Sequence, residues 1–310
     1  MVNLAIDLEF WMTNLPDKLR KLPVIHLAIP GSHDSTTYAI NHTSKISPDA
    51  RKPIQLLKFL EPLLRPLIIK WSKTQSTNIT QQLNAGIRYF DLRIAMKPHS
   101  QNYYFVHNLY SECVDTVLTQ INSFVEEHSS EIVILDFQHF FNLLLSDHKR
   151  LVNQLKSIFG HKLLPYSYSM KHVTLDYMKE HSYQVLLVYR GDISNVEEVL
   201  WPAMSFPTPW PDTFKIPVLI DFINQGLKNR NCALGFVSQC VLTPTVWFAF
   251  RHIFSSLKNK CVLPLEPQKY EWLRQQKPGD SGLNIVISDF VEYQDFAFSK
   301  TVINLNQKLL

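Results

Sequence analysis

Hydrophobic positions along the chain fall into short runs of strand length that alternate with longer segments of helical periodicity. Some runs are continuous and others alternate with polar residues, as expected for strands buried on both faces or on one. About seven strands are predicted in this way, at 24–29, 88–94, 103–107, 132–137 and 184–189, with weaker candidates at 233–237 and 284–288.

Helical spacing is clearest between the third and fourth of these runs. The apolar residues Val114, Val117, Leu118 and Ile121 share one face of a helix over 114–125. Similar patterns predict helices at 145–159, 215–229, 265–276 and 294–309. Alternation of strands and helices favours a parallel sheet with crossover helices. Because there is no linker, repeat or low-complexity tract, we expect one α/β domain over residues 1–310, built as a closed or nearly closed barrel.

Polar residues stand at the ends of most predicted strands. In barrels of this type, catalytic groups gather at the carboxyl ends of the strands. The polar residues at these positions are His33, Asp34, Asp91, Arg93, His107, Gln138, His139, Arg190 and Asp289. Each one alone has an ordinary explanation, such as a polar turn or a helix cap. Their concentration at one predicted edge indicates an active site.

Two histidines that flank an arginine suit the cleavage of a phosphodiester. A neutral imidazole can take a proton from an attacking hydroxyl, and an imidazolium can protonate the leaving oxygen, both near neutral pH. A guanidinium can bind two phosphate oxygens at once and offset their charge. Carboxylates beside the histidines would fix the tautomers of the rings and stabilise the charged form.

Composition narrows the class of protein. The 310 residues carry a net charge of +4 spread along the chain, which is too diffuse for a nucleic-acid-binding surface and fits weak attraction to anionic lipid. The four cysteines have scattered spacings that match no disulfide framework or zinc site. We see no secretory signal and no apolar run long enough to span a bilayer. We therefore expect a cytoplasmic monomer with peripheral membrane contact.

Five segments together resemble the X domain of phosphatidylinositol-specific phospholipase C. They are IPGSHDST (29–36), WSKTQSTNITQQLNAGIRYFDLRI (71–94), YYFVHNLY (103–110), EIVILDFQHF (131–140) and NIVISDF (284–290). The closest likeness is to small proteins that carry this catalytic domain without PH, EF-hand, Y or C2 modules. The resemblance covers about residue 20 to the C-terminus and implies a distorted or incomplete TIM-type (β/α) barrel.

The resemblance also implies a choice between two catalytic styles. Calcium-dependent members of the family place an asparagine after the first histidine and use a Glu-x-Asp pair, whereas bacterial members use an arginine in place of the metal. In this sequence Asp34 follows His33, and Asp91 and Arg93 replace the acidic pair. The chain therefore looks like the metal-independent style, with no cofactor.

Residue roles follow from the same resemblance. His33 would be the general base on the inositol 2-hydroxyl, oriented by Asp289. Arg93 would bind the phosphate, supported by Asp91. His107 would be the general acid, paired with Asp34. The expected reaction cleaves phosphatidylinositol to diacylglycerol and an inositol cyclic phosphate, which water then opens.

Two positions bear on the inositol head group. Gln138 replaces a bacterial lysine that contacts the ring, and Arg190 resembles a bacterial ring-contacting arginine. His139 is either a further site member or part of a capped turn. The change at Gln138 leaves open an inositol-lipid-binding protein with weak catalysis. A metal-dependent glycerophosphodiesterase is a separate alternative, against which the replacement of the acidic pair by Asp91 and Arg93 argues.

Two further segments are unusually apolar or rigid. Residues 54–70 (IQLLKFLEPLLRPLIIK) are either a core-facing helix broken by prolines or an interfacial element that touches lipid near the cleft. Residues 201–212 (WPAMSFPTPWPD) predict a rigid loop that borders the cleft or packs against the core.

Overall fold

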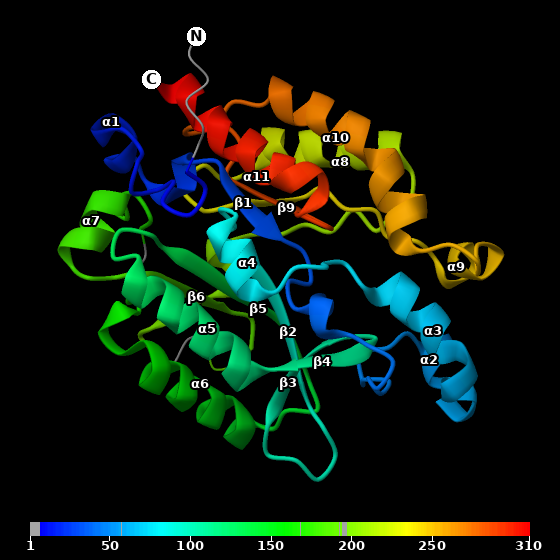
Figure 1. The fold of residues 1–310 in the computed structure, drawn as a ribbon. Coiled ribbons are helices and arrows are strands. Elements are labelled where there is room, and N and C mark those ends of the chain that lie inside the picture. The colour runs from blue at the N-terminus through cyan, green and yellow to red at the C-terminus, as the bar shows by residue number, and fades with distance from the viewer. Residues whose placement is uncertain (1–6, 57, 168, 192, 194–196) are drawn as a thin grey trace.

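All nine strands of the computed structural model, which describes residues 7–56, 58–167, 169–191, 193 and 197–310, belong to one sheet (Figure 1). The strands are β1 (Ile29–Ser32), β2 (Tyr89–Met96), β3 (Tyr103–His107), β4 (Leu109–Cys113), β5 (Val133–Phe141), β6 (Val185–Tyr189), β7 (Leu200–Trp201), β8 (Val237–Gln239) and β9 (Ile285–Ser288). Seven of them run parallel in the order β7-β6-β5-β2-β1-β9-β8, and β3 and β4 extend from β2 as an antiparallel hairpin. No pairing joins β7 to β8 within the described residues, so the barrel is incomplete. The predicted fold class is confirmed.

The helices surround this sheet. They are α1 (Asp17–Arg20), α2 (Lys52–Leu56), α3 (Glu61–Ser72), α4 (Ile79–Asn84), α5 (Val114–Glu127), α6 (Leu145–Phe159), α7 (Leu175–Glu180), α8 (Ile216–Asn229), α9 (Val246–Arg251), α10 (Leu263–Gln275) and α11 (Tyr293–Leu305). In Figure 1, α5 and α6 lie on one side of the sheet and α8, α10 and α11 on the other, while α2, α3 and α9 lie together at the right. None of the helices in the described parts of the chain is long and apolar enough to cross a membrane.

Alternate residues of the central strands enter two separate cores. Tyr89 packs inside the barrel with residues of β1, β5, β6 and β9, whereas Phe90 packs outward against the helices. The interior is so tight that a Cβ at Gly31 would lie 2.8 Å from the Tyr89 ring and 2.9 Å from Ile287. Gly31 therefore lets β1 run between β2 and β9, directly below the end of the barrel at which His33 lies.

Two predicted strands begin later than their apolar runs. In the run 24–29, Val24–His26 form a 3₁₀ turn, and the strand starts only at Ile29. Val24, Ile25 and Leu27 are apolar because they are buried beneath the barrel, and not because they pair in the sheet. The run at 233–237 likewise yields a strand only from Val237. The two-residue β7 is too short to be predicted, and the hairpin partner β4 is buried only at Leu109 and Tyr110, which gives no strand pattern.

Candidate active site

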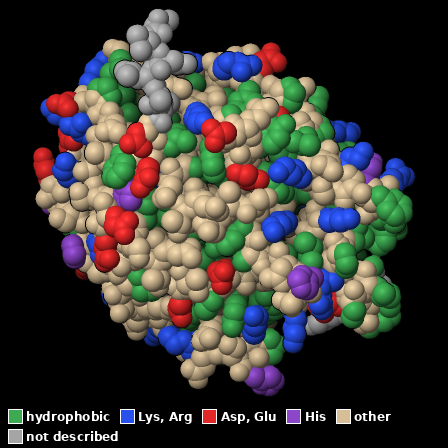
Figure 2. All heavy atoms as spheres, viewed as in Figure 1, with side chains coloured by type: hydrophobic (Ala, Val, Ile, Leu, Met, Phe, Trp, Pro, Cys, Tyr) green, Lys and Arg blue, Asp and Glu red, His purple; other side chains and the backbone are tan. Residues whose placement is uncertain are grey.

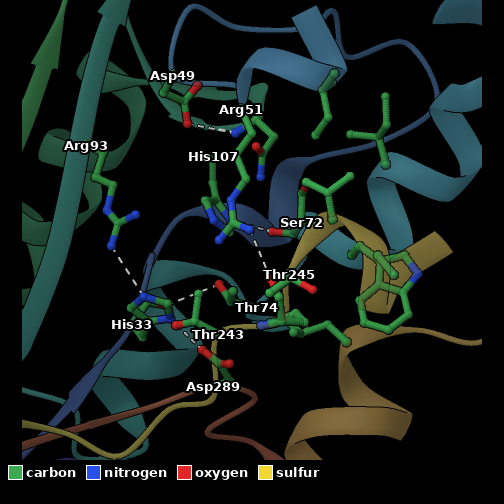
Figure 3. Close-up of a pocket in the computed structure, with 18 of the residues that line it drawn as sticks. His33, Asp49, Arg51, Ser72, Thr74, Arg93, His107, Thr243, Thr245 and Asp289 are labelled. Atoms are coloured by element: carbon green, nitrogen blue, oxygen red, sulfur yellow. Dashed lines mark hydrogen bonds and ion pairs between the residues drawn. The ribbon is translucent and has the colours of Figure 1, made fainter. Parts of the chain in front are cut away.

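A single cavity of about 690 Å³ opens at the carboxyl ends of the strands and brings the predicted site residues together (Figure 3). Eight of them line it: His33, Asp91, Arg93, His107, Gln138, His139, Arg190 and Asp289. Asp34 lies behind this lining, buried between the two histidines and Arg93. A volume of this size is typical of a site for a small molecule.

Strand register places His33 beside Asp289. Ser32 of β1 pairs with Ser288 of β9, and the next residue on each strand carries the side chain of interest. Three residues that directly follow site residues have left-handed backbone, namely Asp34 (φ 43°), Asn108 (φ 58°) and Phe290 (φ 46°). Aspartate and asparagine tolerate this conformation, whereas a phenylalanine there is strained. Such strain is typical of functional sites, where the backbone must turn sharply to present a side chain.

His33 is held from both ring nitrogens. Its Nδ1 lies 2.7 Å from Asp289 Oδ1, and its Nε2 lies 3.3 Å from both Asp34 Oδ2 and Arg93 Nη2. Burial lowers the pKa of His33, but the charges of Asp34 and Asp289 outweigh this effect and raise the pKa to about 9. The Nδ1–H donated to Asp289 leaves Nε2 as the atom that can exchange a proton with a bound substrate.

His107 faces His33 across the pocket, with 6.4 Å between the ring centroids. Its Nδ1 lies 2.7 Å from the carbonyl oxygen of Ser72, so Nδ1 carries the hydrogen of that bond. Its Nε2 lies 3.3 Å from Asp34 Oδ2. Asp34 Oδ2 is therefore equally distant from Nε2 of both rings, whereas the family resemblance implies a pairing with His107 alone.

Arg93 completes the charged cluster. Its Nε lies 2.8 Å from Asp34 Oδ1 and its Nη2 lies 3.1 Å from Asp91 Oδ2. Burial raises the pKa of Asp34, yet the charges of Arg93 and the two histidines lower it to about 2. Both Asp34 oxygens are buried without a well-directed hydrogen bond from the described residues, so they stabilise the cations mainly by charge. The partly buried Arg93 guanidinium is fixed between two carboxylates and stays protonated.

A second network lies on the far side of Arg93. The fully buried Asp136 accepts hydrogen bonds from Arg190 at 2.7 and 2.8 Å, from Tyr89 at 2.7 Å and from Gln138 at 3.0 Å. These contacts fix Arg190 and Gln138 in place while both still border the cavity. A shift in register between β2 and β5 sets His139 opposite Arg93, where burial and the charge of Arg93 lower its pKa.

Two residues that hold the site together have no predicted role. The buried Gln75 donates to the carbonyl oxygens of His33 and Ser288, both at 2.9 Å, and accepts from Val291 N. Thr74 contacts the carbonyl oxygens of His33 and Asp34 at 3.2 Å. Both lie in WSKTQST, which belongs to the resemblance but shows no periodicity that would mark a polar residue as buried.

The family of the chain follows from comparisons with known proteins. A family model described as phosphatidylinositol-specific phospholipase C, X domain, matches residues 67–190. PI-PLC X domain-containing protein 3 of Homo sapiens is 39% identical over 305 residues, covering 97% of this chain and 94% of the relative. PI-PLC X domain-containing protein 2 of Mus musculus is 41% identical over 302 residues, covering 96% and 88%.

Solved structures support the fold. The phosphatidylinositol-specific phospholipase C from Listeria monocytogenes superposes with a TM-score of 0.65 at 20% identity, covering 97% of this chain and 99% of that one. The Staphylococcus aureus enzyme gives 0.67 at 14% identity, covering 97% and 98%. At these identities the likeness concerns the fold, and the sequence relatives carry the family. The chain therefore belongs to the PI-PLC X domain-containing proteins.

Proposed function

We propose that residues 1–310 form a single catalytic domain that cleaves phosphatidylinositol as a metal-independent phospholipase C. The observation that carries this proposal is the pair of imidazoles, His33 and His107, on either side of one buried arginine–carboxylate cluster in a cavity. In each ring Nδ1 is fixed by a hydrogen bond. The other nitrogen, Nε2, lies 3.3 Å from Asp34 Oδ2, which stands between the two rings. This is the arrangement that general acid–base transfer at a phosphodiester requires.

In the first step His33 Nε2 takes the proton of the inositol 2-hydroxyl as that oxygen attacks phosphorus. The bond from phosphorus to the glycerol oxygen breaks, and His107 Nε2 gives its proton to that oxygen, which releases diacylglycerol. Arg93 offsets the charge that develops on the remaining phosphate oxygens. Asp289 keeps the His33 tautomer, and Asp34 stabilises whichever imidazole is charged.

The second step reverses the proton transfers. Water attacks the 1,2-cyclic phosphate, His107 takes its proton, and the 2-oxygen leaves with a proton from His33. Both steps use the same groups, so the acid of one is the base of the other. The product is an inositol monophosphate.

Arg93 is the reason for a metal-independent mechanism. One nitrogen or oxygen from each of His33, Asp34 and Asp91 lies within 4.8 Å of the others, which is a suitable donor set for a cation. The Arg93 guanidinium already pairs with both carboxylates, and its charge opposes a second cation at the same place. The same pairing disfavours a metal-dependent glycerophosphodiesterase.

Arg190 and Gln138 are proposed to contact the inositol ring. Both border the cavity at the ends of β5 and β6, on the side of β2 away from β1, and the ring would lie there if the glycerol oxygen faces His107. Asp136 holds Arg190 from two of its nitrogens, so Arg190 meets the ring as a pre-positioned donor with little mobility to lose.

The outer surface beside the cavity suits a lipid bilayer. Large apolar side chains of the α2–α3 segment and the α9 region are highly exposed: Leu56 (78%), Phe59 (77%), Leu63 (78%), Trp247 (78%) and Phe254 (95%). Figure 2 shows apolar side chains at the right edge of the molecule, where Figure 1 places α2, α3 and α9, with Lys and Arg beside them. Apolar residues with nearby basic ones favour peripheral contact with anionic membranes. We refer to these five residues as the membrane-contact surface.

The experiment is release of diacylglycerol from phosphatidylinositol vesicles in the presence of a chelator. We expect turnover by the wild type, and losses of at least about 10²-fold in His33→Ala and in His107→Ala, as for other general acid–base groups. Activity that disappears in chelator and returns with calcium would contradict the role of Arg93. Unchanged turnover in either histidine variant would overturn the mechanism.

The alternative function is lipid binding with weak catalysis. It is favoured by the raised pKa of His33, because a base that is mostly protonated at neutral pH turns over slowly. This alternative predicts vesicle binding that survives His107→Ala, without diacylglycerol release by the wild type at pH 7.

A further inference from the structure

The cavity that contains the two histidines does not end at the charged cluster. Beyond His107 it continues between α3 and α9, and its lining changes from charged to apolar. The apolar residues of this part are Ile54, Leu64, Leu67, Ile68, Trp71, Leu242, Val246, Ala249, Phe250 and Leu257. We call this part of the cavity the apolar groove.

One wall of the groove is a single face of α3. Leu64, Leu67, Ile68 and Trp71 follow the spacing i, i+3, i+4, i+7, which places their side chains in one stripe. Leu63, at the edge of this stripe and one turn before Leu67, is 78% exposed. α3 therefore presents apolar residues both to the cavity and to solvent, which a helix that only packed against the core would not do.

The other wall comes from α9 and the residues that flank it. Val246, Ala249 and Phe250 repeat the helical spacing i, i+3, i+4 and line the same cavity. The rings of Trp71 and Phe248 meet edge to face at 6.0 Å, so α3 and α9 touch at this point. Arg51 Nη1 also donates to the carbonyl oxygen of Pro244 at 3.0 Å and ties the start of α2 to the segment before α9.

The orientation of His107 connects the groove to the reaction. His107 Nδ1 is bonded to the carbonyl oxygen of Ser72, which is the last residue of α3 (Figure 3). The proposed general acid thus stands at the end of the helix that forms the apolar wall. An oxygen protonated by His107 lies at the entrance to the groove, and whatever that oxygen carries continues along α3.

We propose that the apolar groove binds the first part of one alkyl chain of the lipid, next to the leaving oxygen, while His33 and Arg93 hold the phosphate. The substrate class is then an inositol phosphodiester whose leaving alcohol carries an alkyl chain, including single-chain lipids that act as dispersed monomers. This inference rests on the proposed function. The alkyl chain is the expected occupant because the groove is continuous with the catalytic cavity and both of its walls are apolar.

The test is a series of alkyl inositol 1-phosphates with leaving alcohols of two, four, six and eight carbons, all kept below their aggregation concentration. No bilayer is present, so only the protein can take up the chain. We expect kcat/KM to rise roughly fourfold per methylene while the groove fills, and then to level off. Inositol 1,2-cyclic phosphate, which has no chain, reports the second step alone. A flat series alongside hydrolysis of the cyclic phosphate would overturn the groove and leave the proposed function intact.

Two variants fill the groove from opposite walls. Ala249→Trp and Leu67→Trp should each flatten the chain-length series, and lower kcat/KM for the octyl substrate at least about tenfold more than for the cyclic phosphate. Ala233→Trp is the matched control, because Ala233 is exposed and precedes β8, at the opposite end of the barrel. An unaltered series in either groove variant that folds would contradict the proposal. The wild-type series alone can contradict the proposal, so the test does not depend on whether each variant folds.

If no turnover occurs, a binding measurement tests the apolar groove independently of the proposed catalytic function. Calorimetry with octyl and ethyl inositol 1-phosphate measures the contribution of the chain without catalysis. Tighter binding of the octyl compound to the wild type, lost in Ala249→Trp, would support the groove even in an inactive protein. Equal affinity for the two compounds would overturn it.

Discussion

His33 carries a positive charge in the resting site because two carboxylates face its ring. With a pKa of about 9, roughly one molecule in a hundred has the neutral ring at pH 7. Only the neutral ring can act as the base of the first step. The value of kcat/KM, which reports the free enzyme, should therefore rise with pH as His33 loses its proton, and it should fall where His107 loses the proton that it donates.

Asp289→Asn should shift this rise to lower pH. Asparagine removes one of the two negative charges that raise the pKa of His33, so the neutral ring appears at a lower pH. The maximum of kcat/KM should fall as well, because the hydrogen bond from Nδ1 no longer goes to a carboxylate. The measurement is the pH dependence of kcat/KM on a dispersed substrate. Asp176→Asn, which removes a remote carboxylate paired with Arg20, is the control. A rise that stays at the wild-type pH would show that His33 does not govern it.

The site could be anticipated where a residue stands at or near the end of a recognisable strand. His33 and Asp289 directly follow strands, and Arg93 and His107 lie in the last part of theirs. The structure gathers all four in one cavity. The role of Gln75 could not be anticipated. It bonds the backbone carbonyl oxygens of His33 and Ser288, which belong to segments distant from it in sequence. The sharing of Asp34 between both rings likewise depends on the backbone turn at φ 43°, which no local pattern encodes.

Among the helices, length decides which ones the sequence reveals. α5, α6, α8 and α10 are long enough to show an apolar stripe and lie close to their predicted bounds. The six-residue α4 is too short to show a stripe, although Asn78 and Gln81 form a capping box at its start. In the segment 54–70, residues of α3 are buried or line the cavity while Leu63 is exposed, and contact of this segment with lipid stays a prediction.

Replacing two outward residues of the α2–α3 segment should weaken membrane association. Phe59→Ser with Leu63→Ser removes two side chains that are each more than three-quarters exposed. Loss of their burial in lipid should reduce partitioning to phosphatidylinositol vesicles by about tenfold or more. Vesicle sedimentation measures this, and the loss of activity on vesicles should exceed any loss on dispersed substrate. Leu310→Ser serves as the control, since Leu310 is exposed at the C-terminus. Equal losses on both substrates would place these residues in the catalytic site instead.

The architecture of the whole molecule was accessible from the sequence because most core strands are continuous apolar runs. β5 and β6 are buried over their central residues and lie where the pattern predicts them. What the sequence could not define is the incomplete closure, since β7 and β8 have only two and three residues and pair on one side each. Closure depends on how loops before and after these strands pack, which is a property of the assembled barrel.

The amino end of the barrel depends on a buried ion pair far from the catalytic cavity. Arg88, just before β2, and Glu131, just before β5, are both fully buried and lie 2.8 Å apart. Glu131 also accepts hydrogen bonds from the backbone and hydroxyl of Thr13, both at 2.7 Å. Arg88 donates to the carbonyl oxygen of Leu83 at 2.6 Å. The pair thus joins the first segment of the chain to two central strands.

Glu131→Gln should therefore lower the free energy of unfolding by about 3–5 kcal/mol, because it leaves the Arg88 charge buried without its partner. Denaturant unfolding followed by circular dichroism gives this value. The double variant Arg88→Met with Glu131→Leu removes both charges and should recover much of the loss, since a buried ion pair is often no more stable than an apolar pair of similar size. Under conditions where each variant is folded, kcat/KM on a dispersed substrate should stay near the wild-type value, because the pair lies at the opposite end of the strands from His33. A loss below about 1 kcal/mol in Glu131→Gln would show that the pair is not essential to the barrel.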